Sequence, residues 1–572
     1  MKKAGILILV LWCLQPWSSF ATQNSDQKLY EPTVLRPDDA ANRKAPQQAP
    51  GSQIKIFIPS LPYIYISHAI NGALLRPANN AKGWKFDLAT EYKQLDETTY
   101  EFKLRQGVQF QDGTPFNAGM VLLNMEYFKK KPFLFTKIDT VFDHAEKVDD
   151  FTVRFHLKEK YGQFLNDLIW LEFYSPKYLE KFGWNGKAVC PNLAEPGLYG
   201  LGPYILKEGY IEGDRQTPKA VLEANPLYWD PQYPKIQKIT IYTELDTKEA
   251  LESVLYKEGQ LDIMPIPFSS KIESVLSPHA KVLTAPSTNN WAIHLNLING
   301  NKRLQDKQVR LALNQALNQD NLLKFVYDGE GIVKPTMASP LFPGVDQAVQ
   351  KLQPYSRVND PYAEDTRARL KSILNGLQLK VLTQDRFLFL WRGIEYQLSQ
   401  VGVTLDLEVT KSEKDIFGQL LSTNAGKNTK QWDLLCWGDD DWYFNHPWSA
   451  FLVYRTHSFW STIFPDETLD GYVDALFKTE VNTPEFNATV EKIMRHVYEN
   501  GYMLFVPAPN NVLAVNKEVI YNPYKMAILP LWEIEITQDH WSVRKGDYPD
   551  RLKTPVEIGR FEIKDDAIRQ SN

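Results

Sequence analysis

The chain has 572 residues, which predicts roughly two to four domain-sized units. Its hydrophobic fraction of 43% and charged fraction of 23% are ordinary for a globular protein. A net charge of −5 at pH 7 gives no reason to expect nucleic acid or an anionic membrane surface as a partner. Aromatic residues make up 13% of the chain, which suits either large cores or a roomy pocket that recognises ligands by stacking.

The N-terminal 21 residues have the three parts of a secretory signal. Lys2 and Lys3 give a basic start, and residues 6–14 form an apolar run that is too short to span a bilayer. Ser19-Phe20-Ala21 then places small residues at the positions that a signal peptidase recognises. We expect cleavage near Ala21, and a short membrane anchor is the alternative.

Residues 22–50 are rich in Gln, Pro, Asp and Ala and show no hydrophobic periodicity. This composition predicts a flexible leader that tethers or spaces the folded protein. Signal cleavage would leave two cysteines, Cys190 and Cys436. In an oxidising compartment they could form a disulfide or remain two separate buried thiols, and the sequence leaves both open.

The first half of the chain predicts a strand followed by a small α+β unit. Residues 54–58 alternate between apolar and polar, as a half-buried strand does. Two further alternating strands, at 99–105 and 151–157, flank a helix that starts near Asn117. A capping box at Asp246 then starts a helix that ends at Gly259.

Strands and helices alternate through the second half, which predicts an α/β lobe with a mostly parallel sheet. The expected strands are 291–297, 377–382 and 403–409, and the expected helices are one capped by Asp306, one over 387–400, one near 469–477 and one near 485–498.

The stretch over residues 432–442 is the strongest candidate for a binding site. Residues 434–436 predict a buried strand, and Gly438 is expected to break it. Three consecutive carboxylates follow, on Asp439, Asp440 and Asp441. They repel one another, so a cationic ligand group would relieve the repulsion.

Two indoles, on Trp437 and Trp442, flank these carboxylates and could each add about 0.5–2 kcal/mol of cation–π attraction. The stretch would lie at the C-terminal end of its strand, the edge of an open α/β sheet where ligands usually bind. The alternative is a solvated acidic turn that caps the next helix, with both tryptophans in the core.

The chain shows no motif for catalysis, a cofactor or a metal. Its nine histidines are scattered, without metal-ligand spacing or a nucleophile elbow. His446 lies near the acidic cluster in sequence, but we expect it to be an exposed loop residue rather than a metal ligand. We therefore predict that the protein is not an enzyme.

Several motifs occur together and in order over about residues 52–520. They are 104–116 (LRQGVQFQDGTPF), Gly202-Pro203-Tyr204, 225–229 (NPLYW), 307–316 (KQVRLALNQA), 362–374, and Gln397-Leu398 with Gly402-Val403. In this order and spacing, the chain resembles the family 5 extracellular solute-binding proteins. These are the periplasmic dipeptide, oligopeptide and nickel-binding components of ABC importers.

The resemblance implies an α/β fold of the type II periplasmic-binding-protein kind, with two α/β lobes around a hinged cleft and a small accessory α+β domain. The implied domains are lobe I at 51–75, 197–298 and 505–550, the accessory domain at 76–196, and lobe III at 299–504. It further implies a periplasmic monomer that captures a small molecule or short peptide by closing, and delivers it to an inner-membrane ABC permease.

In peptide-binding members, an Asp shortly after the equivalent of Trp437 holds the α-ammonium of the ligand, and the resemblance places Asp440 there. Asp439 and Asp441 would reinforce it, while Trp437 and Gly438 would shape the pocket. The loop before Pro447 is longer than in the family, so which of the three carboxylates faces the cleft stays open.

Three other residues on or near the expected cleft also enter this hypothesis. Lys414 stands where peptide binders often have a Trp, and it could meet a ligand carboxylate or be a solvated surface residue. Trp291 and His294 lie on the strand that leads into lobe III, where they could line the cleft or belong to the core.

We therefore predict a binding protein for a short peptide or a similar amine-bearing solute. The alternatives are a non-peptide ligand such as a metal chelate, an opine or an amino sugar, an enzyme on this scaffold, or a regulatory protein that binds its partner through residues 22–50.

Overall fold

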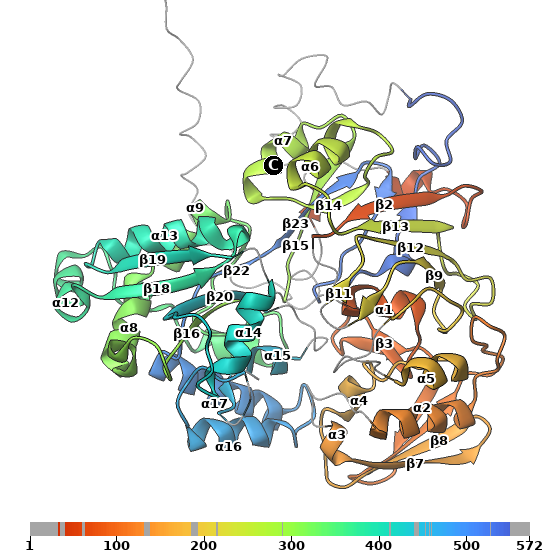
Figure 1. The fold of residues 1–572 in the computed structure, drawn as a ribbon, viewed down its shortest axis with the longest axis horizontal. Coiled ribbons are helices and arrows are strands. Elements are labelled where there is room, and N and C mark those ends of the chain that lie inside the picture. The colour runs from red at the N-terminus through yellow and green to blue at the C-terminus, as the bar shows by residue number, and fades with distance from the viewer. Residues whose placement is uncertain are drawn as a thin grey trace, which may run out of the picture.

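The computed structural model describes residues 33–34, 40–59, 63–130, 138–184, 193–212, 215–288, 290–410, 413–439, 446–451, 454–456, 458, 460–526 and 528–549. The predicted signal peptide, Cys190, Asp440, Asp441 and Trp442 lie outside these residues. Figure 1 shows two large α/β bodies side by side and a smaller sheet-and-helix unit beneath one of them. Among the described residues, no helix is long and apolar enough to cross a membrane.

The first body, lobe I, is built on an eight-stranded sheet. In sheet order its strands are β1 (Thr33–Val34), β15 (Ala280–Ala285), β23 (Asn511–Asn516), β14 (Ile263–Pro265), β2 (Gln53–Phe57), β13 (Lys238–Tyr242), β12 (Lys219–Ala224) and β9 (Tyr204–Glu208). The expected strand at 54–58 is β2, and it pairs parallel with both β13 and β14.

Helices α6 (Thr247–Tyr256) and α7 (Lys271–Val275) pack against strands of this sheet. The N-cap of the predicted capping box is confirmed, because the Asp246 carboxylate accepts hydrogen bonds from the backbone N–H groups of Lys248 and Glu249. Short α1 (Tyr63–Ile70), the hairpin β10 (Ile211–Glu212) with β11 (Arg215–Gln216), and the hairpin β24 (Val519–Ile520) with β25 (Glu535–Ile536) complete the lobe.

The prediction of a flexible leader over 22–50 is wrong for residues 33–34, which pair with β15 as strand β1, and for residues 40–50. Residues 40–43 form a short 3-10 helix in which Ala40 is buried. The N–H of Ala45 donates to the carbonyl of Ile536 at 2.9 Å, and that of Gln48 donates to Lys235 at 2.8 Å. The polar composition hid this segment, because it is held by backbone hydrogen bonds and ion pairs rather than by an apolar face.

The accessory domain is the predicted small α+β unit. Its antiparallel sheet has the order β5 (Ala89–Gln94), β6 (Thr99–Leu104), β8 (Thr152–Leu157) and β7 (Phe142–Asp149), beside the hairpin β3 (Leu75–Pro77) and β4 (Trp84–Phe86). Its helices are α2 (Ala118–Lys130), α3 (Ile138–Val141), α4 (Phe164–Asp167) and α5 (Pro176–Phe182). The sequence did not predict β7, a mostly exposed edge strand that lacks an apolar face.

The accessory domain is hydrogen-bonded to lobe I through Gln111. The N–H of Gln111 donates to the carbonyl of Gly200 at 2.9 Å, and its side-chain amide donates to the carbonyls of Ile70 at 3.2 Å and Tyr204 at 2.7 Å. Within lobe I the glycine turn packs on α1, where the N–H of Gly202 donates to the carbonyl of Ile70 at 2.8 Å. A Cβ at Gly202 would lie 2.6 Å from the Ile70 carbonyl carbon, and one at Gly200 would lie 2.0 Å from the Ile70 oxygen. Only glycine permits so close an approach of two backbones.

Lobe III contains a five-stranded sheet with the order β19 (Thr404–Val409), β18 (Gln378–Thr383), β20 (Leu434–Asp439), β16 (Asn290–Leu295) and β21 (Met503–Leu504). β18 runs parallel to β19 and β20, whereas β16 runs antiparallel to β20 and β21. The predicted mostly parallel sheet is therefore confirmed, and β16 is the strand of this sheet that runs against the others. A two-stranded ladder of β17 (Gly331–Ile332) and β22 (Ala508–Pro509) lies beside it.

The four helices expected in lobe III are present within a few residues of their expected positions, as α8 (Lys307–Ala316), α13 (Leu388–Ser399), α16 (Glu467–Leu476) and α17 (Pro484–Asn500). The lobe also contains α9 (Gln319–Val326), α10 (Val345–Gln350), α11 (Tyr355–Val358), α12 (Glu364–Leu374), α14 (Glu413–Thr423) and α15 (Trp448–Phe451).

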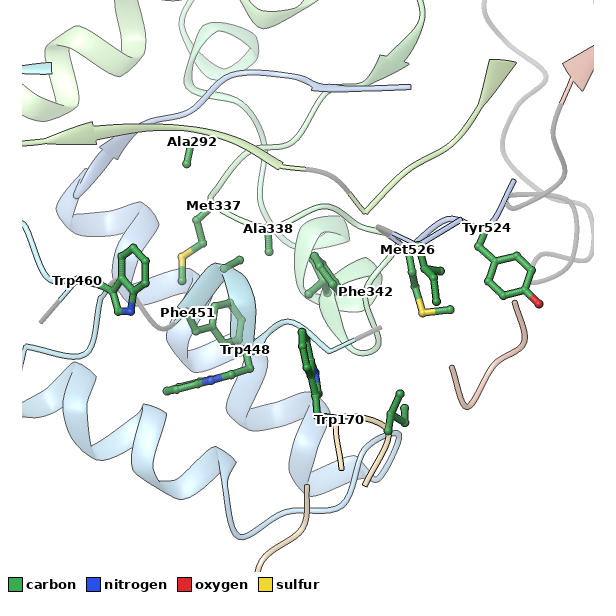
Figure 2. Close-up of a cluster of buried hydrophobic side chains, with 14 of the residues drawn as sticks. Trp170, Ala292, Met337, Ala338, Phe342, Trp448, Phe451, Trp460, Tyr524 and Met526 are labelled. Atoms are coloured by element: carbon green, nitrogen blue, oxygen red, sulfur yellow. The ribbon is translucent and has the colours of Figure 1, made fainter. Parts of the chain in front are cut away.

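A buried apolar cluster draws on all three parts of the molecule (Figure 2). Trp170 comes from the accessory domain, Phe342 and Trp448 come from lobe III, and Met526 follows the last long strand of lobe I. The three parts are thus joined by a common core. The exact domain boundaries stay a prediction.

Candidate ligand-binding site

The candidate site lies where β20 reaches the edge of the lobe III sheet. Trp291 in β16 pairs with Gly438, and Asn290 pairs with Asp439. Gly438 is therefore inside the strand and does not break it, and Asp439 is its last residue. Because β18, β19 and β20 are parallel, Thr383, Val409 and Asp439 all end strands at the same edge. The acidic run thus leaves the sheet at the edge that the sequence predicted.

Trp437 belongs to an aromatic cluster on one face of this sheet. Its indole stacks on that of Trp460, with centroids 5.4 Å apart and planes 13° from parallel. Phe417 of α14 meets Trp437 edge-on at 6.0 Å and Trp460 edge-on at 4.7 Å. Trp437 is half-buried as a result. Sequence reasoning missed Phe417 and Trp460, since neither lies near the acidic stretch in the chain.

Trp291 lies on the other face of the sheet. Trp437 pairs with Ala292, and successive side chains of a strand point to opposite faces. Trp291 instead makes edge contacts with Tyr327 at 5.4 Å and Phe387 at 4.9 Å. The structure therefore does not bring Trp291 and Trp437 together, although their strands are neighbours.

Two cations of the protein lie near β20. Burial raises the pKa of the Cys436 thiol, while the nearby charges of Arg386 and Lys334 act to lower it. Lys334 is fully buried and donates to the carbonyl of Met337 at 3.3 Å. Arg386 donates to the Gln384 side chain at 3.1 Å, just beyond the end of β18. Neither cation was found from the sequence, because each comes from a different segment.

The structure describes some of the remaining candidate residues and not others. Lys414 lies in the first turn of α14, at the same sheet edge. Cys436 is a free, buried thiol, so the disulfide alternative does not hold for it. Asp440 and Asp441 lie outside the described residues, so their roles stay a prediction.

The prediction that His446 is an exposed loop residue is wrong. Its ring is buried, accepts the N–H of Trp448 on Nδ1 at 3.0 Å and meets Phe486 edge-on at 5.4 Å. Burial lowers its pKa to about 3. His294 is also buried, with a pKa lowered to about 4, and its Nε2 has no hydrogen-bond partner among the described residues. Within the same residues, no three His, Cys, Asp or Glu side chains are arranged to hold a metal ion.

Comparison with known proteins supplies the family context for this geometry. The chain is similar to the glutathione-binding protein GsiB of Escherichia coli K12, with 30% identity over 267 residues. That alignment covers 44% of this chain and 48% of GsiB, so the match spans about half the length of the relative.

The fold is shared with solved structures of low sequence identity. The murein tripeptide-binding protein MppA of Escherichia coli matches with a TM-score of 0.65 and 18% identity, over 86% of this chain and 99% of MppA. A structure described as the unliganded open form of MppA matches with a TM-score of 0.60 and 19% identity, over 86% and 98% of the two chains.

These likenesses establish the type II periplasmic-binding-protein fold, with two α/β lobes and an additional domain. The family model for bacterial extracellular solute-binding proteins, family 5 (Middle), matches residues 84–371, about half of the 572-residue chain. The matched residues begin in the accessory domain and end in α12 of lobe III, so they include parts of both. The chain therefore belongs to family 5 of the bacterial extracellular solute-binding proteins.

Proposed function

We propose that this protein captures a short peptide or a similar amine-bearing solute in the periplasm and delivers it to an ABC permease in the inner membrane. The observation that carries the proposal is the course of β20. It brings the start of the acidic run, Asp439, to the C-terminal edge of the lobe III sheet, beside the aromatic cluster of Trp437, Trp460 and Phe417. The names of two similar proteins, a glutathione-binding and a murein tripeptide-binding protein, both describe peptide ligands.

In this proposal Asp440 holds the ligand ammonium, and Asp439 and Asp441 add negative charge around it. A charge-assisted hydrogen bond to a carboxylate contributes about 1.5–3 kcal/mol. Trp437 and Gly438 shape the wall beside the ammonium. The protein works by binding and release as a monomer, with no chemical step and no cofactor.

The acidic run and Lys414 together fit a ligand that carries both charges. Three adjacent carboxylates repel one another, and a ligand ammonium would relieve that repulsion. Lys414, at the same edge, would then meet the ligand carboxylate. A zwitterionic peptide satisfies both requirements, whereas a simple amine satisfies only the first. Trp291 lies on the opposite face and would contribute only if the ligand extends around the sheet edge.

The test is native mass spectrometry of the mature protein, purified from the periplasm without denaturation. A ladder of co-purified masses spaced by amino-acid residues would support a peptide ligand. A single mass that fits a metal chelate, an opine or an amino sugar would keep the fold and overturn the peptide.

The regulatory alternative requires residues 22–50 to be available to bind a partner, but part of this segment is already packed against the protein itself. Residues 40–50 pack against lobe I through backbone hydrogen bonds to Ile536 and Lys235. Removal of residues 22–32 should therefore leave ligand binding intact if the protein is a transport component. Loss of function after that deletion would favour the regulatory alternative.

A further inference from the structure

The accessory domain touches lobe III directly, at the loop before α4 and the end of α16. The N–H of Gly162 donates to the carbonyl of Phe477 at 2.8 Å. The rings of Tyr161 and Phe477 stack, with centroids 6.1 Å apart and planes 24° from parallel. A second hydrogen bond crosses the same junction, from the Asn482 side chain to the carbonyl of Ala81 at 3.4 Å.

Position 162 accepts only glycine while this contact is made. A Cβ at Gly162 would lie 2.0 Å from the carbonyl oxygen of Thr479, 2.3 Å from its carbonyl carbon and 2.9 Å from the nitrogen of Glu480. These three nearest atoms are all backbone atoms of lobe III, so no side-chain rotation would remove the clash. Gly162 itself does not adopt the left-handed backbone conformation. A larger residue would thus be accepted at this position if lobe III moved away.

The contact lies far from the segments that join the two lobes. The chain passes between lobe I and lobe III after β15, which ends at Ala285, and again between β21 and β23. Lys271 of lobe I and the lobe III residues Asp328 and Glu330 form ion pairs at 2.8 Å at that end. In Figure 1 β15 and β23 lie in the upper half, whereas α4 and α16 lie in the lower half. Rotation about the connections would therefore separate Gly162 from Thr479 before it disturbed either lobe.

The same contact is linked to the candidate site through Phe477. Phe477 meets Trp448 edge-on, with ring centroids 4.4 Å apart. Trp448 is the first residue of α15, which follows the acidic run in the chain. The accessory domain moves with lobe I, because its residue Gln111 is hydrogen-bonded to the carbonyls of Gly200, Ile70 and Tyr204 in lobe I.

We propose that Gly162 is the closing contact of the accessory domain on lobe III and limits how far the protein closes around its ligand. This inference rests on the proposed function, in which the ligand is captured by closure. Gly162 is a positioning residue, since it acts on the distance between the two bodies and not on the ligand.

The test traps the contact with a short bismaleimide. Ala81→Cys and Asn482→Cys place two thiols at exposed positions on either side of the junction. Cys190→Ser is included to avoid a second reactive thiol, and Cys436 is buried and can stay. The cross-linking rate is compared between this parent protein, Gly162→Val and Gly471→Ala. Gly471 is the matched control, because it lies on α16, is exposed, and has open space where a Cβ would lie.

We expect Gly162→Val to cross-link roughly tenfold more slowly than the parent or slower still, because the side chain would have to enter filled space. Gly471→Ala should match the parent. Circular dichroism and thermal unfolding check that Gly162→Val is folded. If it is not, Gly162→Ala presents the same clash with a smaller side chain and should still slow the reaction.

Equal rates in the parent and in a folded position-162 variant would overturn the inference, as would a parent protein that does not cross-link. The measurement needs no ligand, so it is separate from the test of the proposed function. If the position-162 variant cross-links slowly but the protein binds no peptide, the closing contact is supported and the proposed peptide ligand is rejected.

Discussion

Replacement of Arg43 by Met should release the N-terminal segment from lobe I. The Arg43 guanidinium donates to Glu518 at 2.6 and 3.3 Å and to Asp539 at 2.7 Å. The Glu518 carboxylate also accepts from the Tyr548 hydroxyl at 2.6 Å and from the Thr537 hydroxyl. The Arg43 side chain is 12% exposed and that of Glu518 is 3% exposed, so water cannot replace the lost partner.

Breaking a buried ion pair by removing one partner costs about 3–5 kcal/mol. In the variant, Glu518 keeps its two hydroxyl donors, so we take the lower end of this range, about 3 kcal/mol. This free energy corresponds to a roughly hundredfold or greater change in the equilibrium for release of the N-terminal segment from lobe I. Lys44 is the matched control at the next position. It pairs with Glu535 at 2.9 Å, but its side chain is 46% exposed, so Lys44→Ala should cost no more than about 1 kcal/mol.

Amide hydrogen exchange measures this release locally. The N–H of Ala45 donates to Ile536 and that of Gln538 donates to Arg43, so both amides are protected only while the segment is docked. Arg43→Met should speed their exchange about a hundredfold, and Lys44→Ala by about fivefold at most. Similar exchange in the two variants would refute the assignment of the docking energy to the buried pairs.

Three further predictions concern the candidate site and lobe III. Asp440→Asn should weaken binding of an amine ligand by roughly 1.5–3 kcal/mol in calorimetry, with exposed Asp385→Asn as the control, and unchanged affinity would reject the anchor. Trp460→Ala should destabilise lobe III by about 3–5 kcal/mol in urea and lose near-ultraviolet dichroism, because it removes the ring stacked on Trp437. Burial lowers the pKa of His294 from 6.5 to about 4, so the unfolded state takes up its proton first. Between pH 6.5 and about 4, His294 should therefore lower stability by up to about 1.4 kcal/mol per pH unit, in addition to the similar effect of buried His446. Thermal unfolding of His294→Leu should show a slope that is smaller by this amount, and an equal slope in the variant would contradict the assignment.

The regular elements could be predicted because each carries its signal locally. The β2 strand alternates in its own sequence, and the caps at Asp246 and Asp306 lie beside the helices that they start. The antiparallel direction of β16 could not be predicted in this way. It depends on the chain entering lobe III from lobe I at Asn290, which is a long-range property that no window of sequence contains.

The candidate site likewise has features that local sequence predicts and features that depend on distant segments. The position of Asp439 at a sheet edge follows from the strand signal of residues 434–436, together with the general location of sites in α/β sheets. The burial of His446 and the nearness of Lys334 to β20 arise from packing between distant segments. Composition near a residue gives its chemistry, but the groups that tune it come from elsewhere in the fold.

The aromatic surroundings of the acidic run illustrate why this matters for the ligand. The sequence suggested that a cation could lie between two indoles. In the structure, one face of Trp437 is covered by Trp460 at a centroid distance of 5.4 Å, and Phe417 makes a T-shaped contact with the same indole at 6.0 Å. At most one face of this ring is left for a cation, which is worth about 0.5–1 kcal/mol where water has access. That is less than a charge-assisted hydrogen bond to a carboxylate, so the affinity of an ammonium ligand should depend mainly on the aspartates. Replacing Trp437 should then change the affinity less than replacing the anchoring Asp.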